Sequence, residues 1–114
     1  MLPPSVRIFV ASQPVDFRLS FDRLAAWTQE QLQGDPFSGH LFVFRNRRGD
    51  RVKILYWDRT GYCQFYKRLE KGTFRLPSSA QSSVELEWAE LALLLEGIEL
   101  EGARRRPRWL RRVA

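Results

Sequence analysis

The chain has 114 residues, 44% of them hydrophobic and 13% aromatic, so we expect one folded domain and exclude a fully disordered chain. Its formal charge of +6 is uneven: residues 1–77 carry a net +6, residues 78–101 a net −6 and residues 102–114 again +6. This pattern predicts a basic body, an acidic helix and a basic tail, and it bears on the kind of partner rather than on the fold.

The first elements are predicted from local signals. Residues 6–11 are rich in β-branched and aromatic side chains and indicate a short strand that ends before Pro14. Apolar residues then recur at helical spacing behind a possible N-cap, Ser20, which predicts a helix over residues 20–33. Gly34 is well placed as the residue after the helix end.

Two strand-like runs, residues 40–46 and 51–57, flank a turn at residues 47–50 and predict a hairpin that pairs Phe44 with Lys53. Side chains alternate across a strand, so one face is mainly aliphatic and is the better core candidate, whereas the opposite face is half aromatic and half cationic. We therefore predict an α+β fold, with a small antiparallel sheet centred on a 40–57 hairpin and packed with two or three short helices.

The next segment allows two interpretations. Tyr62, Phe65, Tyr66 and Leu69 fall at helical spacing, but a strand that extends the hairpin suits the aromatic content equally, so residues 62–71 stay open between helix and strand. Residues 78–83 have the composition of a flexible linker. We expect residues 1–102 to form the domain and residues 103–114 to form a basic, flexible tail.

A second helix is predicted at about residues 87–96, a segment that is apolar nearly all round. Burying a leucine is worth about 1.5–3 kcal/mol, whereas an exposed ion pair is worth about 0–1 kcal/mol. We therefore expect Leu91 and Leu94 to hold this helix to the core, in preference to its glutamates pairing with the basic body.

The chemistry of catalysis and metal binding is poorly represented. A single histidine and a single cysteine cannot supply the ligands of a zinc site, and no glycine-rich phosphate loop is present. The aspartates lie mostly in turns or at a helix start, where aspartate is favoured for local hydrogen bonding. We expect no enzymatic activity, no catalytic residues, no metal and no cofactor. The lone Cys63 and the shortness of the apolar runs favour a cytoplasmic protein that does not enter a membrane.

Cations and aromatic rings alternate through residues 34–77, a pattern typical of surfaces that hold a phosphate backbone and stack on bases. A solvated surface explains any single arginine equally well, and both interpretations stay open. The candidate nucleic-acid contacts are Arg45, Arg47, Arg48, Arg51, Lys53, Trp57, Lys67, Arg68, Lys71, Arg75, Arg104, Arg105, Arg106 and Arg108.

Several segments of this sequence are similar to those of a known family: PVDFR (residues 14–18), FDRLA (21–25), DPFSGHLFVFRNRRGDRVKILYWDRTGYC (35–63), YKRLEKGTFRLP (66–77) and LALLLEGIEL (91–100). With them the chain resembles the Orf2-like accessory proteins, often called TnpB, of the bacterial insertion sequence 66 family. The resemblance implies a role in transposition of a mobile element, alongside a separate, larger transposase that carries the catalytic residues.

Two functions are compatible with this resemblance. The protein is either a DNA-binding module that holds transposon ends or target DNA through the hairpin and tail, or an adaptor that docks the transposase without touching DNA. Salt separates them, because phosphate contacts weaken steeply with salt and apolar docking does not. The candidate contacts of the adaptor are Trp88, Leu91, Leu95 and Trp109.

Overall fold

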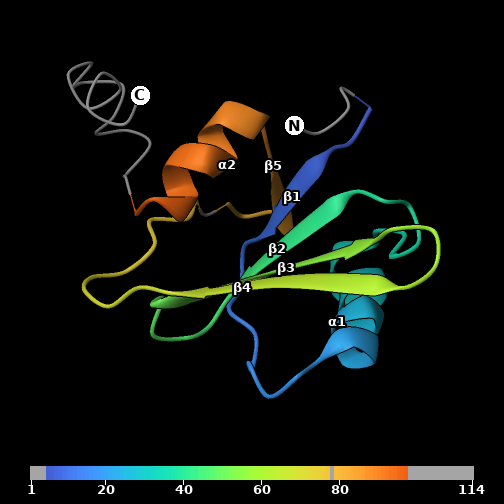
Figure 1. The fold of residues 1–114 in the computed structure, drawn as a ribbon, viewed down its shortest axis with the longest axis horizontal. Coiled ribbons are helices and arrows are strands. Elements are labelled where there is room, and N and C mark those ends of the chain that lie inside the picture. Colours follow the sequence, from blue (N-terminus) through green and yellow to red (C-terminus); the bar gives the residue numbers. More distant parts are fainter. Residues whose placement is uncertain (1–4, 78, 98–114) are drawn as a thin grey trace.

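The computed structural model describes residues 5–77 and 79–97, which form one five-stranded sheet with a helix on each face (Figure 1). The strands lie in the order β4-β3-β2-β1-β5. In chain order the elements are β1 (Ile8–Ala11), α1 (Phe21–Trp27), its π-helical continuation η1 (Thr28–Leu32), β2 (Leu41–Arg45), β3 (Arg51–Trp57), β4 (Tyr62–Arg68), β5 (Ser83–Leu86) and α2 (Trp88–Leu95).

The α+β class and the central hairpin are confirmed, but the sheet is mixed rather than wholly antiparallel. β1 pairs in parallel with β2, with Ile8 opposite Leu41, while the other three strand pairs are antiparallel. Parallel neighbours need a long crossover connection, and the segment that contains α1 and η1 provides it. The predicted antiparallel sheet is therefore corrected at this one pair of strands.

The hairpin has the predicted register, with Phe44 opposite Lys53. The next segment is a strand: β4 pairs with β3 along its whole length, from Tyr62 opposite Trp57 to Arg68 opposite Arg51. Of the two interpretations left open, the strand is therefore the one observed. Pairing with β3 satisfies the backbone N–H and C=O groups of this segment, and its side chains pack beside those of β3.

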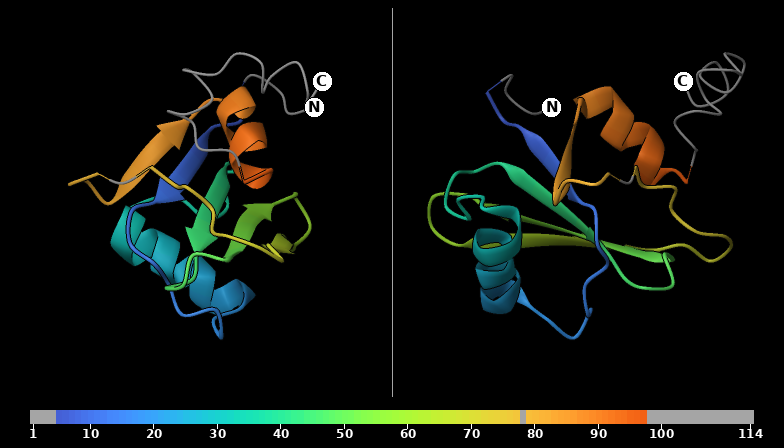
Figure 2. Two further views of the ribbon diagram at one scale, coloured as in Figure 1. Left: turned by 90° about the vertical axis from the view of Figure 1, so that its left-hand side faces the viewer. Right: turned by 180° about the vertical axis from the view of Figure 1, so that it is seen from behind.

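Both faces of the hairpin are buried, so the aliphatic face predicted as the better core candidate is confirmed as core, and the aromatic and cationic face is a second core face. On the aliphatic face Val43 and Ile54 pack against Leu91 and Leu94 of α2. On the other face Phe42, Phe44 and Leu55 pack in a second cluster with α1. Figure 2 shows the two helices on opposite sides of the sheet, an arrangement in which both faces of the central strands are covered.

The predicted helix at residues 20–33 is confirmed as α1 followed by η1. Its end differs in one detail, because Gln33 and not Gly34 has the left-handed conformation, with φ 56°. Gly34 is needed for space instead: a Cβ built there would lie 2.7 Å from the Phe42 ring.

The predicted helix near the end of the domain is confirmed as α2, and Leu91 and Leu94 are both buried in the core. Glu87 and Glu90 form a capping box at its start. The predicted linker at residues 78–83 is partly a strand, because Ser83 begins β5 and pairs with Ala11 of β1. The tail, residues 103–114, lies outside the described residues. Within the described ranges, no helix has the length and hydrophobicity that crossing a bilayer requires.

Candidate nucleic-acid interface

The turn between β2 and β3 is held by hydrogen bonds from backbone N–H groups to one side chain. The Asn46 side chain accepts hydrogen bonds from the backbone N–H groups of Gly49 and Arg51, each at 3.0 Å. The segment after β4 then docks on this turn, because Leu69 N–H donates to the Asp50 carbonyl and Phe74 N–H donates to the Gly49 carbonyl, both at 2.8 Å. Two stretches of chain therefore meet at one end of the sheet.

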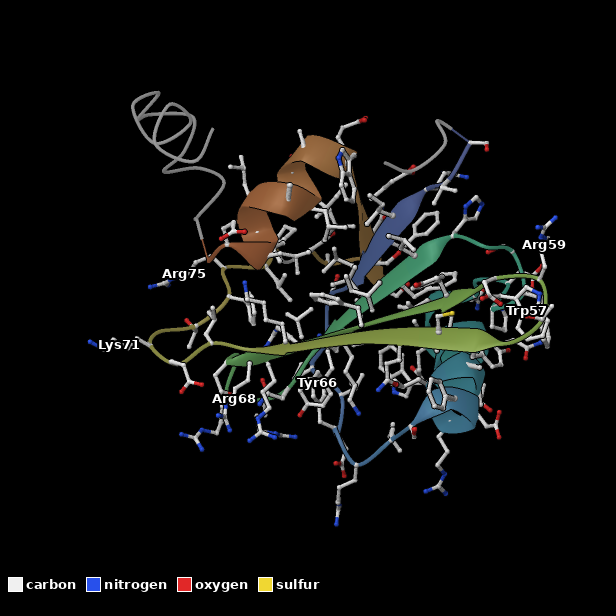
Figure 3. All side chains as sticks on the ribbon, viewed as in Figure 1. Trp57, Arg59, Tyr66, Arg68, Lys71 and Arg75 are labelled. Atoms are coloured by element: carbon white, nitrogen blue, oxygen red, sulfur yellow. The ribbon has the colours of Figure 1, made fainter. Side chains whose placement is uncertain are left out.

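Cations from both stretches gather there. Arg51 of β3 lies opposite Arg68 of β4, and Figure 3 shows Arg68, Lys71 and Arg75 toward the same end of the sheet. Few acidic groups balance them: Glu70 pairs with Arg68 at 3.1 Å, and a hydrogen bond from Asn46 lowers the pKa of Asp50. We call this surface the basic end; it consists of Arg47, Arg48, Arg51, Arg68, Lys71 and Arg75.

Lys53 does not belong to the basic end, although the sequence predicted it as a phosphate contact. Its side chain is only 4% exposed, and its Nζ donates to the carbonyl oxygens of Phe17 and Leu19 at 2.8 and 2.9 Å. The ammonium also lies 4.9 Å from the centre of the Phe17 ring. Burial lowers the pKa of Lys53, while the nearby charge of Asp16 raises it. Lys53 therefore holds the loop before α1 against the sheet, and its ammonium is occupied by two backbone carbonyls.

Two other predicted contacts are placed elsewhere, and a third is partly buried next to the hairpin turn. Lys67 donates from Nζ to the Leu95 carbonyl at 2.7 Å and so satisfies the end of α2. Trp57 lies at the opposite end of the sheet, near Arg59 (Figure 3), where its ring contacts Phe37 at 5.0 Å between centroids. Arg45 is half-buried at the end of β2. The structure therefore separates the predicted aromatic residue from the predicted cations.

Of the predicted partner contacts on α2, two pack against the core and one is exposed. Leu91 is buried and Leu95 packs partly against the same core, so the apolar side of the helix already faces its own domain. Trp88 remains 47% exposed. The remaining predictions for partner and nucleic-acid contacts, Trp109, Arg104, Arg105, Arg106 and Arg108, lie outside the described residues.

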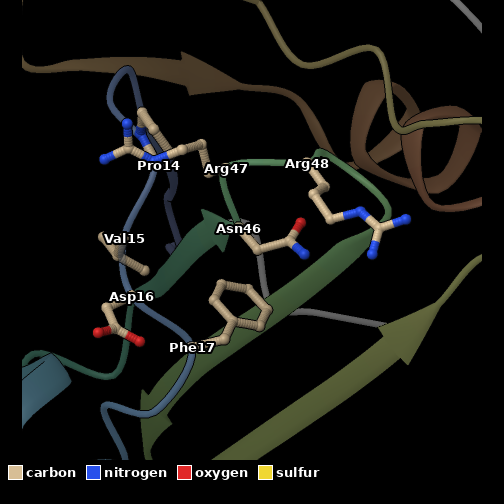
Figure 4. Close-up of a pocket in the computed structure, with 7 residues that line it drawn as sticks. All are labelled: Pro14, Val15, Asp16, Phe17, Asn46, Arg47 and Arg48. Atoms are coloured by element: carbon tan, nitrogen blue, oxygen red, sulfur yellow. The ribbon is translucent and has the colours of Figure 1, made fainter.

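Sequence reasoning missed a feature beside the basic end. The loop at residues 14–18 runs along β2, where Val15 N–H donates to the Arg45 carbonyl at 2.9 Å. Between this loop and the hairpin turn lies a cavity of about 350 Å³ (Figure 4). Its lining consists of Pro14, Val15, Asp16, Phe17, Asn46, Arg47 and Arg48. In the sequence, this loop is the segment PVDFR, which contributes to the family resemblance but did not lead to a prediction of a binding site.

The charge of Asp16 is neutralised locally. Its carboxylate accepts hydrogen bonds from Arg18 Nη2 at 2.6 Å and Nε at 3.0 Å, which lower the pKa of Asp16 to about 2. The cavity is therefore less acidic than its lining residues indicate. In residues 5–77 and 79–97, no three histidine, cysteine or acidic side chains come together in a way that could hold a metal ion.

Comparisons with known proteins agree with the resemblance found in the sequence. The family model described as "IS66 Orf2 like protein" matches residues 6–105. Two similar proteins come from Sinorhizobium fredii (strain NBRC 101917 / NGR234). The uncharacterized protein y4jC is 38% identical over 109 residues, which cover 94% of this chain and 93% of y4jC. The uncharacterized protein y4hO is 41% identical over 101 residues, which cover 87% of this chain and 88% of y4hO. No solved structure matches.

Proposed function

The chain belongs to the IS66 Orf2-like family, and from this premise we propose that it is a non-catalytic accessory protein that binds DNA through its basic end. The family associates the chain with transposition of an insertion sequence. The DNA would be the transposon ends or the target, and the transposase of the same element would be the second partner. One observation carries the DNA-binding proposal: cations from two separate stretches of chain gather on one rigid end of the sheet.

The arrangement of charge at the basic end supports this proposal. Arg51 and Arg68 lie directly opposite each other on neighbouring strands, a position in which like charges repel. A phosphate backbone would relieve this repulsion while releasing its counterions, which is the main source of affinity in DNA binding that is independent of sequence. Arg51 Nη1 also donates to Tyr66 Oη at 3.0 Å, and Tyr66 exposes an aromatic ring beside the cations.

The last described residue of the chain lies close to this surface. The described chain ends at Gly97, where an added Cβ would lie 3.7 Å from the Leu69 side chain. Leu69 belongs to the segment that docks on the hairpin turn. Gly97 is the last described residue before the arginines of the sequence, and its place near the basic end supports the proposal that hairpin and tail act on the same polyanion.

The aspartates of the domain have structural roles, which supports a non-catalytic function. Asp35 accepts a hydrogen bond from Phe37 N–H at 2.9 Å, and Asp58 accepts hydrogen bonds from Thr60 N–H and Gly61 N–H. These contacts are those of ordinary turns. A carboxylate that closes a turn in this way is already occupied and is poorly placed to act as a general base.

A second candidate, the adaptor that docks the transposase without touching DNA, is favoured by exposed aromatic side chains away from the basic end. Phe37 is 59% exposed, and its ring lies within 5.7 Å of the Tyr62 ring. Trp88 is exposed on α2. Exposed aromatic residues are enriched at protein interfaces. This candidate no longer depends on Leu91, because that side chain is buried.

The salt dependence of binding to a duplex of the element's terminal repeat tests the proposal. Changing Arg48→Gln together with Arg68→Gln should reduce the slope of log K against log salt by about 1.8, since each phosphate contact contributes about 0.9. The matched control changes Arg23→Gln and Arg59→Gln, two exposed arginines outside the basic end, and should leave the slope unchanged. Equal slopes in both double variants would exclude the basic end as the DNA-binding surface. Binding to purified transposase alone, with no detectable DNA binding, would favour the adaptor.

A further inference from the structure

The cavity beside the basic end combines two kinds of lining. Arg47 and Arg48 line it from the β2–β3 turn with side chains that extend to opposite sides, and Val15 and Phe17 contribute apolar surface from the facing loop (Figure 4). Its volume of about 350 Å³ is far greater than the roughly 30 Å³ that a water molecule occupies and is in the range of small-molecule sites. A bare phosphate would leave the apolar lining exposed to water.

The guanidinium groups are available for a ligand. Among residues 5–77 and 79–97, neither Arg47 nor Arg48 makes a side-chain hydrogen bond or ion pair. The carboxylate in the lining, Asp16, already accepts hydrogen bonds from Arg18 on both of its oxygens. An anionic group at either side of the cavity therefore meets a guanidinium group that has no hydrogen bond or ion pair of its own, and the acid in the lining is already paired.

The aromatic part of the lining is held in place. The Phe17 ring makes an edge contact with Tyr66, with centroids 5.7 Å apart, and the Lys53 ammonium lies 4.9 Å from its centre. The Lys53 hydrogen bond to the Phe17 carbonyl fixes the backbone at the same residue. A preorganised ring of this kind loses little conformational freedom when another flat group stacks on it.

We propose that this cavity takes one unpaired nucleotide of DNA, with its base against Phe17 and the phosphates that flank it toward Arg47 on one side and Arg48 on the other. The inference rests on the proposed DNA binding and deepens it. A base inside a duplex is stacked on its neighbours and cannot enter a pocket, so the nucleotide must be extrahelical or single-stranded. A cationic groove with an aromatic platform is the combination that binds unpaired nucleotides without reading their sequence.

Three fluorescent DNA probes with the same paired sequence test the proposal by anisotropy at one salt concentration: a paired duplex, the same duplex with one extra unpaired thymine, and the same duplex with an abasic residue in place of that thymine. We expect the unpaired thymine to be bound about five- to tenfold more tightly than the other two, the effect of one base stacked on an aromatic ring. The abasic probe retains the distorted backbone and so separates recognition of the base from recognition of the distortion.

The Phe17→Leu variant should lose this preference and bind all three probes as the wild type binds the paired duplex. The matched control is Phe37→Leu, which changes an exposed phenylalanine that is not part of the cavity and should retain the preference. Circular dichroism melting checks that both variants are folded. A photo-crosslink needs no variant: 5-iodouracil at the unpaired position should attach to the tryptic peptide of residues 8–18, which contains Phe17.

The outcomes separate this inference from the proposed function. Equal binding of the three probes, equally tight binding of the abasic probe, a preference that persists in folded Phe17→Leu, or a crosslink to another peptide would each overturn the nucleotide site while leaving duplex binding intact. If the cavity instead binds an acidic segment of a partner protein, the three probes bind equally and Phe17→Leu weakens only the binding of that partner. No binding of the paired duplex at any salt concentration would contradict the proposed function itself.

Discussion

Lys53 illustrates how the position of a single residue changes its role. In the sequence it is one cation among several, and the hairpin register places it on the face with Phe42 and Phe44. Because α1 covers that face, the side chain is buried and its ammonium is satisfied by two backbone carbonyls of the preceding loop. Burying an ammonium group without hydrogen-bond acceptors would be strongly unfavourable. The two carbonyl groups therefore allow Lys53 to be buried, and Lys53 in turn fixes the loop.

At this scale we predict the effect of Lys53→Met, which retains the length of the side chain but not its hydrogen bonds. Two carbonyl groups lose their donor, so the free energy of unfolding should fall by about 1–3 kcal/mol, measured by urea denaturation. The matched control, Lys71→Met, changes an exposed lysine and should have almost no effect on stability. An unchanged urea midpoint for Lys53→Met together with a reduced salt slope in DNA binding would show that Lys53 contacts phosphate after all.

The elements at the end of the domain depend on contacts with distant segments. β5 follows a serine-rich stretch, and its strand is defined by pairing with β1, as in the pair of Val84 with Val10. α2 comes directly after it and covers the aliphatic face of the sheet. The capping box of Glu87 and Glu90 sets where α2 begins, but the burial of its leucines is what attaches it to the domain.

At the scale of elements we predict the effect of Leu94→Ala. Leu94 is fully buried between α2 and the sheet, so truncation leaves a cavity and should lower the free energy of unfolding by about 2–5 kcal/mol. Trp88→Ala, on the exposed start of the same helix, should cost clearly less. Urea denaturation of both variants measures the difference. Similar losses for the two variants would show that α2 is held mainly by its N-terminal turn.

The whole molecule is polarised along its sheet. The basic end lies at the β2–β3 turn, and the ring cluster of Phe37, Trp57 and Tyr62 lies at the other end (Figure 3). β3 joins the two ends over its seven residues, so a span of roughly 20 Å separates Arg51 from Trp57. DNA bound at the basic end would leave the aromatic end accessible to the transposase, so DNA binding and docking of the transposase are compatible within one protein.

At this scale we predict that deleting residues 103–114 leaves the melting temperature within about 2–4 °C, the shift that half a kcal/mol produces in a domain of this size. The affinity for duplex DNA should fall, and its salt dependence should weaken, because six arginines are removed. A full-length variant with these six arginines changed to glutamine is the control and should bind DNA as the deletion does. A large loss of thermal stability in the deletion would show that the tail is part of the fold.

The sequence by itself determined the elements whose signals are local. The helix at residues 20–33, the hairpin register and the helix at residues 87–96 follow from periodicity, capping and turn residues within about a dozen positions. The family resemblance likewise rests on contiguous sequence segments. These features depend on neighbours along the chain, so the order of the residues is sufficient to predict them.

Only the tertiary structure decided which of these residues meet. Contacts between distant segments cover the second face of the hairpin, bury Lys53, pair β5 with β1, and bring the loop at residues 14–18 to the turn at residues 46–50. Trp57 and Arg51 belong to one strand, yet its extended backbone carries them to opposite ends of the sheet. Burial and pairing across such separations depend on the packing of the whole chain, which no local pattern records.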